Sequence, residues 1–373
     1  METSIEYDVA VLGGGAAGCA TALALQQNGI SKILVVESGR YEAIRVGESI
    51  PPDTRILLKK LGILADFLKE NHETCLGSCS SWGDDGLGYN DFLFNPHGNG
   101  WHLDRRRFEA FLARKVIESG VELRTGTKFE KGESIGSKGF QLQLRGDNQE
   151  TELVDARFVV DATGMRSCFA RNWGARRLFL DRLIFAIAFF ELSASSNFSN
   201  LTMLEAVEYG WWYAAKLPKR RLVTAVASEP AIIKQTTLNR SDNWLAHLKK
   251  TNHISRELVG CHLIEDSLLI CAAPSFLLNH TAGNGWLAVG DAASTYDPIS
   301  SQGIYKALSD SLQAAKVIAA YLSGDTQSLS EYQSSITTRF DNYLQNRNYF
   351  YQLEKRWSTS RFWKRRQERV GLI

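Results

Sequence analysis

The sequence lacks the features that would place it in a membrane or in a disulfide scaffold. Its 373 residues contain no apolar run that reaches the ~18 residues of a membrane span. Six cysteines are scattered without the spacing of a metal or redox site, so we expect reduced thiols and no metal. A predicted strand begins within a few residues of the N-terminus and leaves no room for a signal peptide. We therefore expect a cytoplasmic protein without a transmembrane segment.

The chain also has little net charge. A value of +2 gives the molecule as a whole no electrostatic reason to bind nucleic acid. The basic excess lies in residues 351–373, which hold seven Lys or Arg residues and two Glu. With Phe362 and Trp363 among them, these charges predict either a solvated terminal helix or a surface that docks a partner protein or a membrane. Helical spacing just before them predicts one face packed on the body, formed by Phe350, Leu353 and Trp357.

What the sequence does contain begins with a strand, a glycine-rich turn and a helix. Residues 6–12 are an apolar run of strand length, and residues 33–37 form the next strand, so the segment predicts a βαβ unit. Gly13, Gly15 and Gly18 have the GxGxxG spacing of a dinucleotide-binding turn, in which the first glycine makes the turn, the second admits a pyrophosphate and the third lets helix and strand pack.

An acidic residue and two further loops extend this signature. Glu37 lies 24 residues after Gly13, where a carboxylate would bind ribose hydroxyls. Gly290 and Asp291 follow a second apolar strand, and Asp291 could accept a hydrogen bond from a ribityl chain. The helix after this loop could stabilise negative charge on a reduced flavin. The segment from Asp161 to Gly164 ends a third strand, and together the three signatures predict FAD, bound non-covalently.

These residues resemble the flavoprotein monooxygenase superfamily with the para-hydroxybenzoate hydroxylase fold. Residues 45–52 look like the GES-x-P loop of flavin-dependent halogenases and geranylgeranyl reductases, and Arg105 resembles their pyrophosphate-binding arginine. Three segments are similar to LodB/GoxB/QhpG-type flavoproteins, which modify tryptophan in partner amine or amino-acid oxidases: 91–105, 210–218 and 297–304.

Signatures and resemblance together predict which residues contact FAD. These are Gly13, Gly15, Ala16, Ala17, Gly18, Glu37, Ser38, Arg45, Glu48, Ser49, Arg105, Asp161, Gly164, Gly290, Asp291, Pro298, Ser301, Gln302, Gly303 and Ile304.

The fold class expected is α/β, a Rossmann-type FAD-binding domain interrupted by an antiparallel-sheet substrate domain, with a C-terminal helical extension. Strand-like segments between residues 183 and 228 predict the antiparallel sheet. The expected boundaries are 1–55, 100–175 and 275–325 for the FAD-binding domain, 56–99 and 176–274 for the substrate domain, and 326–373 for the extension.

The resemblance implies an FAD-dependent monooxygenase. Reduced FAD would react with oxygen to give a C4a-hydroperoxide, and an electron-rich aromatic substrate would attack its distal oxygen. An indole is the favoured ring, free or within a partner oxidase as in tryptophylquinone biogenesis. No second dinucleotide signature is present, so either a separate flavin reductase or a transiently bound reductant is expected to supply electrons. The candidate catalytic residues are His97, Trp212, Tyr213 and Pro298.

Other interpretations stay open. A histidine such as His97 is more often structural than an acid or base, and aromatic strand residues such as Trp212 and Tyr213 more often belong to the core. Consecutive strand residues cannot share one face. Halogenases of this fold carry a catalytic lysine before a tryptophan-ended strand, but residues 75–82 contain none. Lys59 and Lys60 are better explained as a solvated helix face. A halogenase, a geranylgeranyl-reductase-like enzyme and an FAD-bound assembly factor for a partner oxidase remain alternatives.

Overall fold

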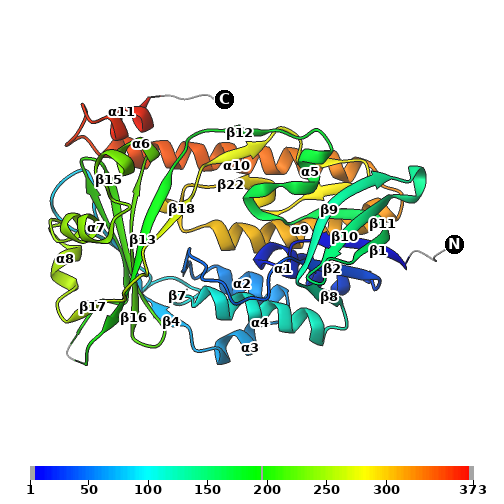
Figure 1. The fold of residues 1–373 in the computed structure, drawn as a ribbon, viewed down its shortest axis with the longest axis horizontal. Coiled ribbons are helices and arrows are strands. Elements are labelled where there is room, and N and C mark those ends of the chain that lie inside the picture. Colours follow the sequence, from blue (N-terminus) through cyan, green and yellow to red (C-terminus); the bar gives the residue numbers. More distant parts are fainter. Residues whose placement is uncertain (1–4, 195, 369–373) are drawn as a thin grey trace.

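The protein is described by a computed structural model that covers residues 5–194 and 196–368. Two large sheets lie at opposite ends of the molecule, and the long helices α9 and α10 run between them (Figure 1). The first sheet has the strand order β20-β21-β11-β1-β2-β8, with β10 and β9 added beside β11. Its strands are β1 (Ile5–Leu12), β2 (Ile33–Glu37), β8 (Glu122–Thr125), β9 (Thr127–Ser134), β10 (Phe140–Gly146), β11 (Thr151–Asp161), β20 (Ala282–Gly283) and β21 (Trp286–Ala288).

The centre of this sheet is parallel, as the βαβ pattern predicts. β1 pairs in parallel with both β2 and β11, and β11 with β21. Every residue of β2 is buried, which is typical of a parallel strand covered on both faces. α1 (Ala16–Gln27) packs against α9 (Gly303–Leu322), where Thr21 Oγ1 donates to Ser311 Oγ at 2.9 Å. Segments more than 250 residues apart in sequence therefore form one dinucleotide-binding layer.

The second sheet is largely antiparallel, as predicted from residues 183–228. Its order is β17-β13-β16-β15-β14-β5-β6, and β18 also pairs with β13. Only the pairing of β14 with β5 is parallel among the described strands of this sheet. The strands are β5 (Gly77–Ser81), β6 (Gly88–Asp91), β13 (Ile184–Leu192), β14 (Leu201–Val207), β15 (Gly210–Leu217), β16 (Arg221–Ser228), β17 (Cys261–Leu263) and β18 (Leu269–Ala272).

Two three-stranded sheets and shorter helices complete the body. One small sheet is β12 (Arg177–Phe179), β19 (Phe276–Leu278) and β22 (Ser294–Thr295); the other is β3 (Ser49–Ile50), β7 (Gly100–His102) and β4 (Glu73–Cys75). The remaining helices of the body are α2 (Thr54–Lys60), α3 (Leu64–Lys69), α4 (Arg105–Glu118), α5 (Cys168–Asn172), α6 (Pro230–Gln235), α7 (Ser241–Leu248) and α8 (Ile254–Glu257).

The described residues also bear on membrane spans, metal sites and the state of the cysteines. Within 5–194 and 196–368 no helix is both long enough and apolar enough to cross a membrane, and no group of three His, Cys, Asp or Glu side chains is arranged to hold a metal ion. The six cysteines are free thiols. The α/β fold class with its helical extension is confirmed, whereas the domain boundaries stay a prediction.

The C-terminal extension differs from the docking surface that its composition suggested. α10 (Gln327–Leu353) ends before Trp357, and it exposes Phe350 and Leu353 instead of burying them. Phe362 and Trp363, on α11 (Arg361–Gln367), are fully buried against the antiparallel sheet, where Trp363 Nε1 donates to the Val207 carbonyl at 2.9 Å. The apolar residues of the tail are therefore already used within this fold.

The basic residues of α11 are also partly engaged. Arg365 and Arg366 pair with Glu229 at 2.9 and 3.3 Å, and Arg366 is buried. α11 lies beside α6 and the ends of the antiparallel strands (Figure 1). The docking alternative gave Phe362 and Trp363 as apolar anchors beside Arg361, Lys364, Arg365 and Arg366. It is wrong for Phe362, Trp363 and Arg366, which are buried, because sequence pattern alone cannot tell a buried basic helix end from a solvated one. Arg369, also counted among the basic residues, lies outside the described residues.

Candidate functional site

One cavity of about 570 Å³ lies between the parallel sheet and the antiparallel sheet. Its volume is within the usual range for small-molecule and cofactor sites. Most of the residues predicted to contact a cofactor line it. They are Gly13, Gly15, Ala16, Ala17, Glu37, Ser38, Arg45, Glu48, Ser49, Arg105, Gly164, Asp291, Pro298, Ser301, Gln302, Gly303 and Ile304.

The glycine-rich turn is shaped by close packing on one side and open space on the other. A Cβ on Gly13 would lie 2.2 Å from the Ala162 carbonyl oxygen, and one on Gly18 would lie 1.8 Å from the Gly13 carbonyl oxygen. A Cβ on Gly15 would meet no protein atom within 4 Å. Gly18 therefore serves helix–strand packing and does not line the cavity, whereas Gly15 leaves room for a bound group beside the backbone.

The Glu37 side chain binds the backbone of this turn. Its carboxylate accepts hydrogen bonds from the Gly14 and Gly39 amides, both at 2.7 Å, and the side chain is buried. A carboxylate has further lone pairs, so it can still accept from ribose hydroxyls. The backbone bonds fix its orientation before any ligand arrives.

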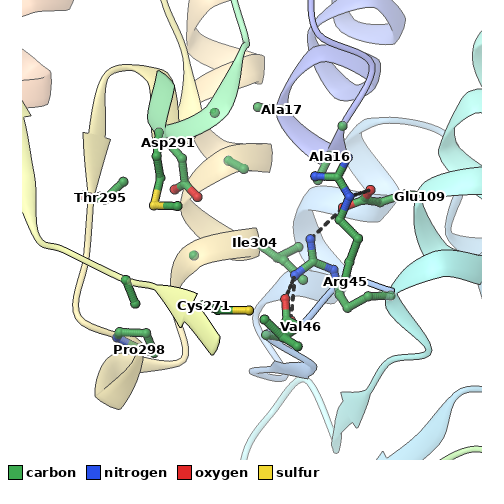
Figure 2. A pocket seen from close by; sticks show the side chains of 18 of the residues that line it. Ala16, Ala17, Arg45, Val46, Glu109, Cys271, Asp291, Thr295, Pro298 and Ile304 are labelled. Atoms are coloured by element: carbon green, nitrogen blue, oxygen red, sulfur yellow. Dashed lines mark hydrogen bonds and ion pairs between the residues drawn. The ribbon is translucent and has the colours of Figure 1, made fainter. Parts of the chain in front are cut away.

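An arginine pair forms one wall of the cavity. Arg105 donates to the Val46 and Gly47 carbonyls at 2.6 and 2.9 Å and to Glu109 at 2.7 Å. Arg45 lies 3.2 Å from the other oxygen of Glu109. Figure 2 shows Arg45 and Glu109 on this wall, facing Asp291, Thr295 and Pro298 on the opposite wall. Sequence reasoning missed Glu109, although its i, i+4 spacing from Arg105 on a helix is a readable signal.

The opposite wall comes from the loop before α9. Asp291 lies 3.3 Å from the buried Lys306 ammonium, and half of its side chain is exposed. Asp297 is fully buried, and burial raises the pKa of its carboxyl although Arg347 opposes the effect. The Tyr351 hydroxyl donates to Asp297 at 2.7 Å, so α10 holds this loop from behind.

Besides Gly18, two further residues predicted to contact the cofactor lie outside the described lining of the cavity. Asp161 is buried, and it accepts hydrogen bonds from the Thr163 amide, the Thr163 hydroxyl and the Ala170 amide at 3.0, 2.6 and 2.8 Å. Gly290 has φ +58°, and a Cβ there would lie 2.7 Å from the Ala17 Cβ. Neither is among the described residues that line the cavity. Asp161 shapes the loop that brings Gly164 to the cavity, and Gly290 allows close packing on α1.

The antiparallel sheet supplies an apolar and aromatic half of the cavity. On β13, β15 and β16 its lining residues alternate along the strands, as one sheet face requires. The lining residues are Phe185 and Ile187 on β13, Trp211 and Tyr213 on β15, Val223 and Ala225 on β16, and Leu269, Cys271 and Ala272 on β18.

Two candidate catalytic residues lie elsewhere. Trp212 points to the opposite face of the sheet, where its ring lies 5.1 Å from that of Trp244 and its Nε1 donates to Tyr209. His97 Nε2 lies 3.7 Å from Asp53, and neither His97 nor Trp212 belongs to the described lining of the cavity. Strand alternation places Trp212 on the face of β15 that points away from the cavity. His97 lies in the loop before β7, outside the described lining of the cavity.

The two halves of the cavity meet at Glu48, Ser49 and Tyr213. Ser49 Oγ lies 3.0 Å from the Tyr213 hydroxyl. Burial raises the pKa of Glu48 to about 7, although the nearby Arg105 guanidinium opposes the shift. Burial likewise raises the pKa of Tyr213 well above its ordinary value, with the Glu48 carboxyl adding to the effect. Tyr213 is the candidate catalytic residue, besides Pro298, that the fold places in the cavity.

The polar groups of the cavity fit a flavin dinucleotide. Gly15 leaves space at the helix N-terminus, where backbone N–H groups attract phosphate. Arg105 Nε is buried without a partner among the described residues, and Glu48 Oε1 is in the same condition. Buried donors and acceptors without partners are costly, so a polar ligand at this place would satisfy them. The assignment of each residue to an FAD atom stays a prediction.

Comparisons with known proteins agree with this geometry. The FAD binding domain family matches residues 6–346. LodB of Marinomonas mediterranea, named as an FAD-dependent oxidoreductase, is 28% identical over 364 residues, 96% of each chain. The structure of the myxobacterial chondrochloren halogenase CndH has a TM-score of 0.89 at 21% identity, covering 97% of this chain and 86% of that one.

A second solved structure is that of the peptidyl tryptophan dihydroxylase QhpG, essential for tryptophylquinone cofactor biogenesis. It superposes with a TM-score of 0.77 at 22% identity, over 99% of this chain and 80% of that one. These likenesses confirm the predicted kinship with flavin monooxygenases and halogenases. The chain belongs to the FAD binding domain family and is an FAD-dependent oxidoreductase.

Proposed function

We propose that this protein hydroxylates an aromatic ring, with the indole of a tryptophan residue in a partner protein as the favoured substrate. The observation that carries the proposal is the composition of the sheet half of the cavity. Its wall is apolar and aromatic, and none of its described lining residues is a lysine. Such a wall suits a flat, apolar ring and excludes water from it.

The cofactor would lie in the other half. Gly15, Glu37, Arg105 and Asp291 would hold its phosphates, ribose and ribityl chain, and the N-terminus of α9 would face its ring system. When bound and reduced, FAD supplies the activation of molecular oxygen that no side chain can provide. The remaining tasks belong to the chain: to hold the ring, to keep water out and to move protons. A separate flavin reductase would deliver the electrons.

One comparison supports a peptidyl substrate: QhpG, which shares the fold, is named as a peptidyl tryptophan dihydroxylase. A tryptophan presented by a protein would need the cavity to be reachable at the junction of the two sheets. Ile44 lines the cavity and is 63% exposed, so the Arg45 loop lies at its mouth.

Halogenation is the second candidate, because CndH shares the fold. Halogenases of this fold use a lysine near the substrate, and the described residues of β5, which end before Trp82, contain none. Lys128 lines the cavity, but it belongs to β9, on the side of the parallel sheet. A hydroxylase needs no such lysine, so the cavity wall favours hydroxylation.

The test is a comparison of products with and without halide. The holoenzyme is reduced anaerobically and mixed with oxygenated buffer that contains tryptophan, indole or a tryptophan-bearing peptide, with or without bromide. Mass spectrometry should find the mass of added oxygen in at least one substrate, independent of bromide. A brominated product would establish the halogenase alternative, and recovery of all three substrates unchanged would overturn the proposal for these substrates.

Trp211 and Trp212 offer a matched pair of variants. They are neighbours on β15, but only Trp211 lines the cavity. Trp211→Leu should lower the yield of oxygenated product per flavin reduced, whereas Trp212→Leu should lower thermal stability and leave that yield unchanged in the folded fraction. Equal yields for the two variants would contradict the placement of the ring against β15.

A further inference from the structure

Glu48 is a buried carboxyl group that faces the cavity without a charge partner of its own. Its side chain is only 4% exposed, and Oε1 has no hydrogen-bond partner among the described residues. The nearest cation, Arg105, is already bonded to two carbonyls and to Glu109. An ionised carboxylate here would be both desolvated and poorly compensated, so the protonated form is favoured.

The groups that face Glu48 come from several elements. Arg105 approaches from α4, Tyr213 from β15 and Cys271 from β18. The Arg105 charge favours the carboxylate, whereas burial favours the acid and prevails, which leaves the pKa near 7. The Tyr213 phenol and the Cys271 thiol are both held neutral, because burial raises the pKa of each. A carboxyl poised near neutrality can give and take a proton at physiological pH.

A chain of hydroxyl groups leads away from this carboxyl. The Tyr213 phenol is close enough to Glu48 for the carboxyl to raise the pKa of the phenol further, and its hydroxyl lies 3.0 Å from Ser49 Oγ. Ser49 Oγ lies 3.0 Å from Thr202 Oγ1, which lies 2.9 Å from His102 Nε2. Each hydroxyl can donate and accept, so the chain can pass a proton by exchanging its bonds.

The chain ends at a buried neutral imidazole. His102 is fully buried, and its Nδ1 has no partner among the described residues. Burial lowers the pKa of His102 to about 4, so the ring stays neutral near pH 7, with one nitrogen that carries a hydrogen and one that can accept a hydrogen bond. Three regions distant in sequence contribute to this path: β3, β7 and the neighbouring strands β14 and β15. Packing of an inert core would not require so many polar groups in a row.

We propose that Glu48 is the proton donor of the cavity and that Tyr213, Ser49, Thr202 and His102 form the relay that resupplies it. The inference rests on the proposed hydroxylation. In each turnover the ring C–H, one O₂ and the two electrons and two protons of the reduced cofactor give a ring C–OH, one water and oxidised cofactor. One oxygen atom must leave as water, and the Glu48 carboxyl gives it a proton. The carboxylate then regains a proton that the ring carbon releases as the C–H bond breaks, directly or through the relay.

Infrared spectroscopy tests the protonation state without turnover. The carbonyl stretch of a protonated carboxyl group is separate from the bands of carboxylates. The wild-type holoenzyme should show such a band that disappears as pH rises through about 7, and Glu48→Gln should lack it. Glu133→Gln, at an exposed carboxylate on β9, is the control and should retain the band. If the band is identical in wild type and Glu48→Gln, Glu48 is not the group that titrates, and the proposal falls.

Kinetics separate this inference from the proposed function. Glu48→Gln should form oxygenated product about 100-fold more slowly, the usual scale of general acid catalysis, and its rate should not fall as pH rises through 7. Glu48→Asp should restore part of the rate and the pH dependence. If wild type hydroxylates and Glu48→Gln matches its rate and pH profile, the relay is wrong while the function stands. If wild type forms no oxygenated product, the function itself fails.

Tyr213→Phe keeps the proposal testable should Glu48→Gln lose its cofactor. This variant removes one hydroxyl of the relay and should slow product formation while it leaves the infrared band in place. Tyr209→Phe is the matched control, because Tyr209 hydrogen-bonds Trp212 on the opposite side of the sheet from the cavity. Equal rates for Tyr213→Phe and wild type would remove Tyr213 from the relay and overturn the path proposed here.

Discussion

The glycine-rich turn lines the cavity, whereas the C-terminal extension supports one of the cavity loops from behind, and the two depend on the sequence in different ways. The turn is formed by neighbours in the chain: Gly13 has a φ of +110°, and a Cβ on Gly18 would lie 1.8 Å from the Gly13 carbonyl oxygen. The extension contacts the cavity loop only through distant partners: Tyr351 donates to Asp297 and accepts from Trp211 Nε1 at 3.1 Å. A local motif can be read from the sequence, whereas a buttress assembled from remote residues cannot.

The largest effect should come from filling the space beside the turn. Gly15→Val puts a branched side chain where the protein leaves no atom within 4 Å of the Cβ position, so it should abolish FAD binding without disturbing the apoprotein fold. Absorbance and heat release of flavin measure the loss. Gly88→Val, on the exposed strand β6, is the control and should stay yellow. Full flavin content in Gly15→Val would mean that the pyrophosphate lies elsewhere.

The extension should be structural, which a core substitution can show. Trp363→Ala removes a fully buried ring that packs on Trp82 at 5.2 Å, so the free energy of unfolding should fall by about 3–5 kcal/mol. Phe350→Ala, at a half-exposed position, should change it by less than about 0.5 kcal/mol. Denaturant unfolding measures both. If Trp363→Ala lowered the free energy of unfolding only slightly, the tail would not be part of the core, and it could serve as a free docking surface.

The pH dependence of the free energy of unfolding tests the same contrast. Glu48 belongs to a loop near the turn, but it is buried because the antiparallel sheet packs against that loop. Its folded-state pKa of about 7 lies above the ordinary 4.5. Its contribution is therefore full below about pH 4.5 and is lost as pH rises through 7, by up to about 3 kcal/mol. Unfolding free energies of wild type should fall relative to Glu48→Gln between pH 5 and 8. Parallel curves for the two proteins would show that the carboxyl is not buried as described.

The smallest effect should come from the Tyr351 hydroxyl, one of two hydroxyl groups of α10 that bond to Asp297. Tyr351→Phe leaves the ring in place but removes the hydrogen bonds to Asp297 and from Trp211. Stability should fall by about 1–3 kcal/mol, because a buried carboxyl loses a donor. The flavin absorption spectrum should shift as the Asp297–Pro298 loop relaxes. Tyr349→Phe, at an exposed position, is the control. An unshifted flavin spectrum in Tyr351→Phe would show that the Tyr351 hydroxyl does not position the cofactor loop.

The sequence was informative wherever a residue answers to its immediate neighbours. The strand before Gly13, the distance to Glu37 and the segment after β21 predicted the cofactor, and the alternation along β15 predicted that Trp211, Trp212 and Tyr213 could not share a face. It failed where a contact joins distant segments. Trp212 was a candidate although it faces away from the cavity, and Glu109, which pairs with both cavity arginines, went unnoticed.

By itself, then, the sequence determined the FAD-binding turn and the α/β class, because GxGxxG spacing, strand length and helical periodicity are set by backbone geometry within a few residues. Tertiary structure alone decided that Trp363 is core, that Tyr351 supports Asp297, and that burial of Glu48 prevails over the nearby Arg105 charge and raises the pKa of its carboxyl. Burial and the local electrostatic environment are properties of the assembled fold. Neither burial nor the electrostatic environment is determined by a residue's own side chain, so the amino-acid sequence pattern could not predict them.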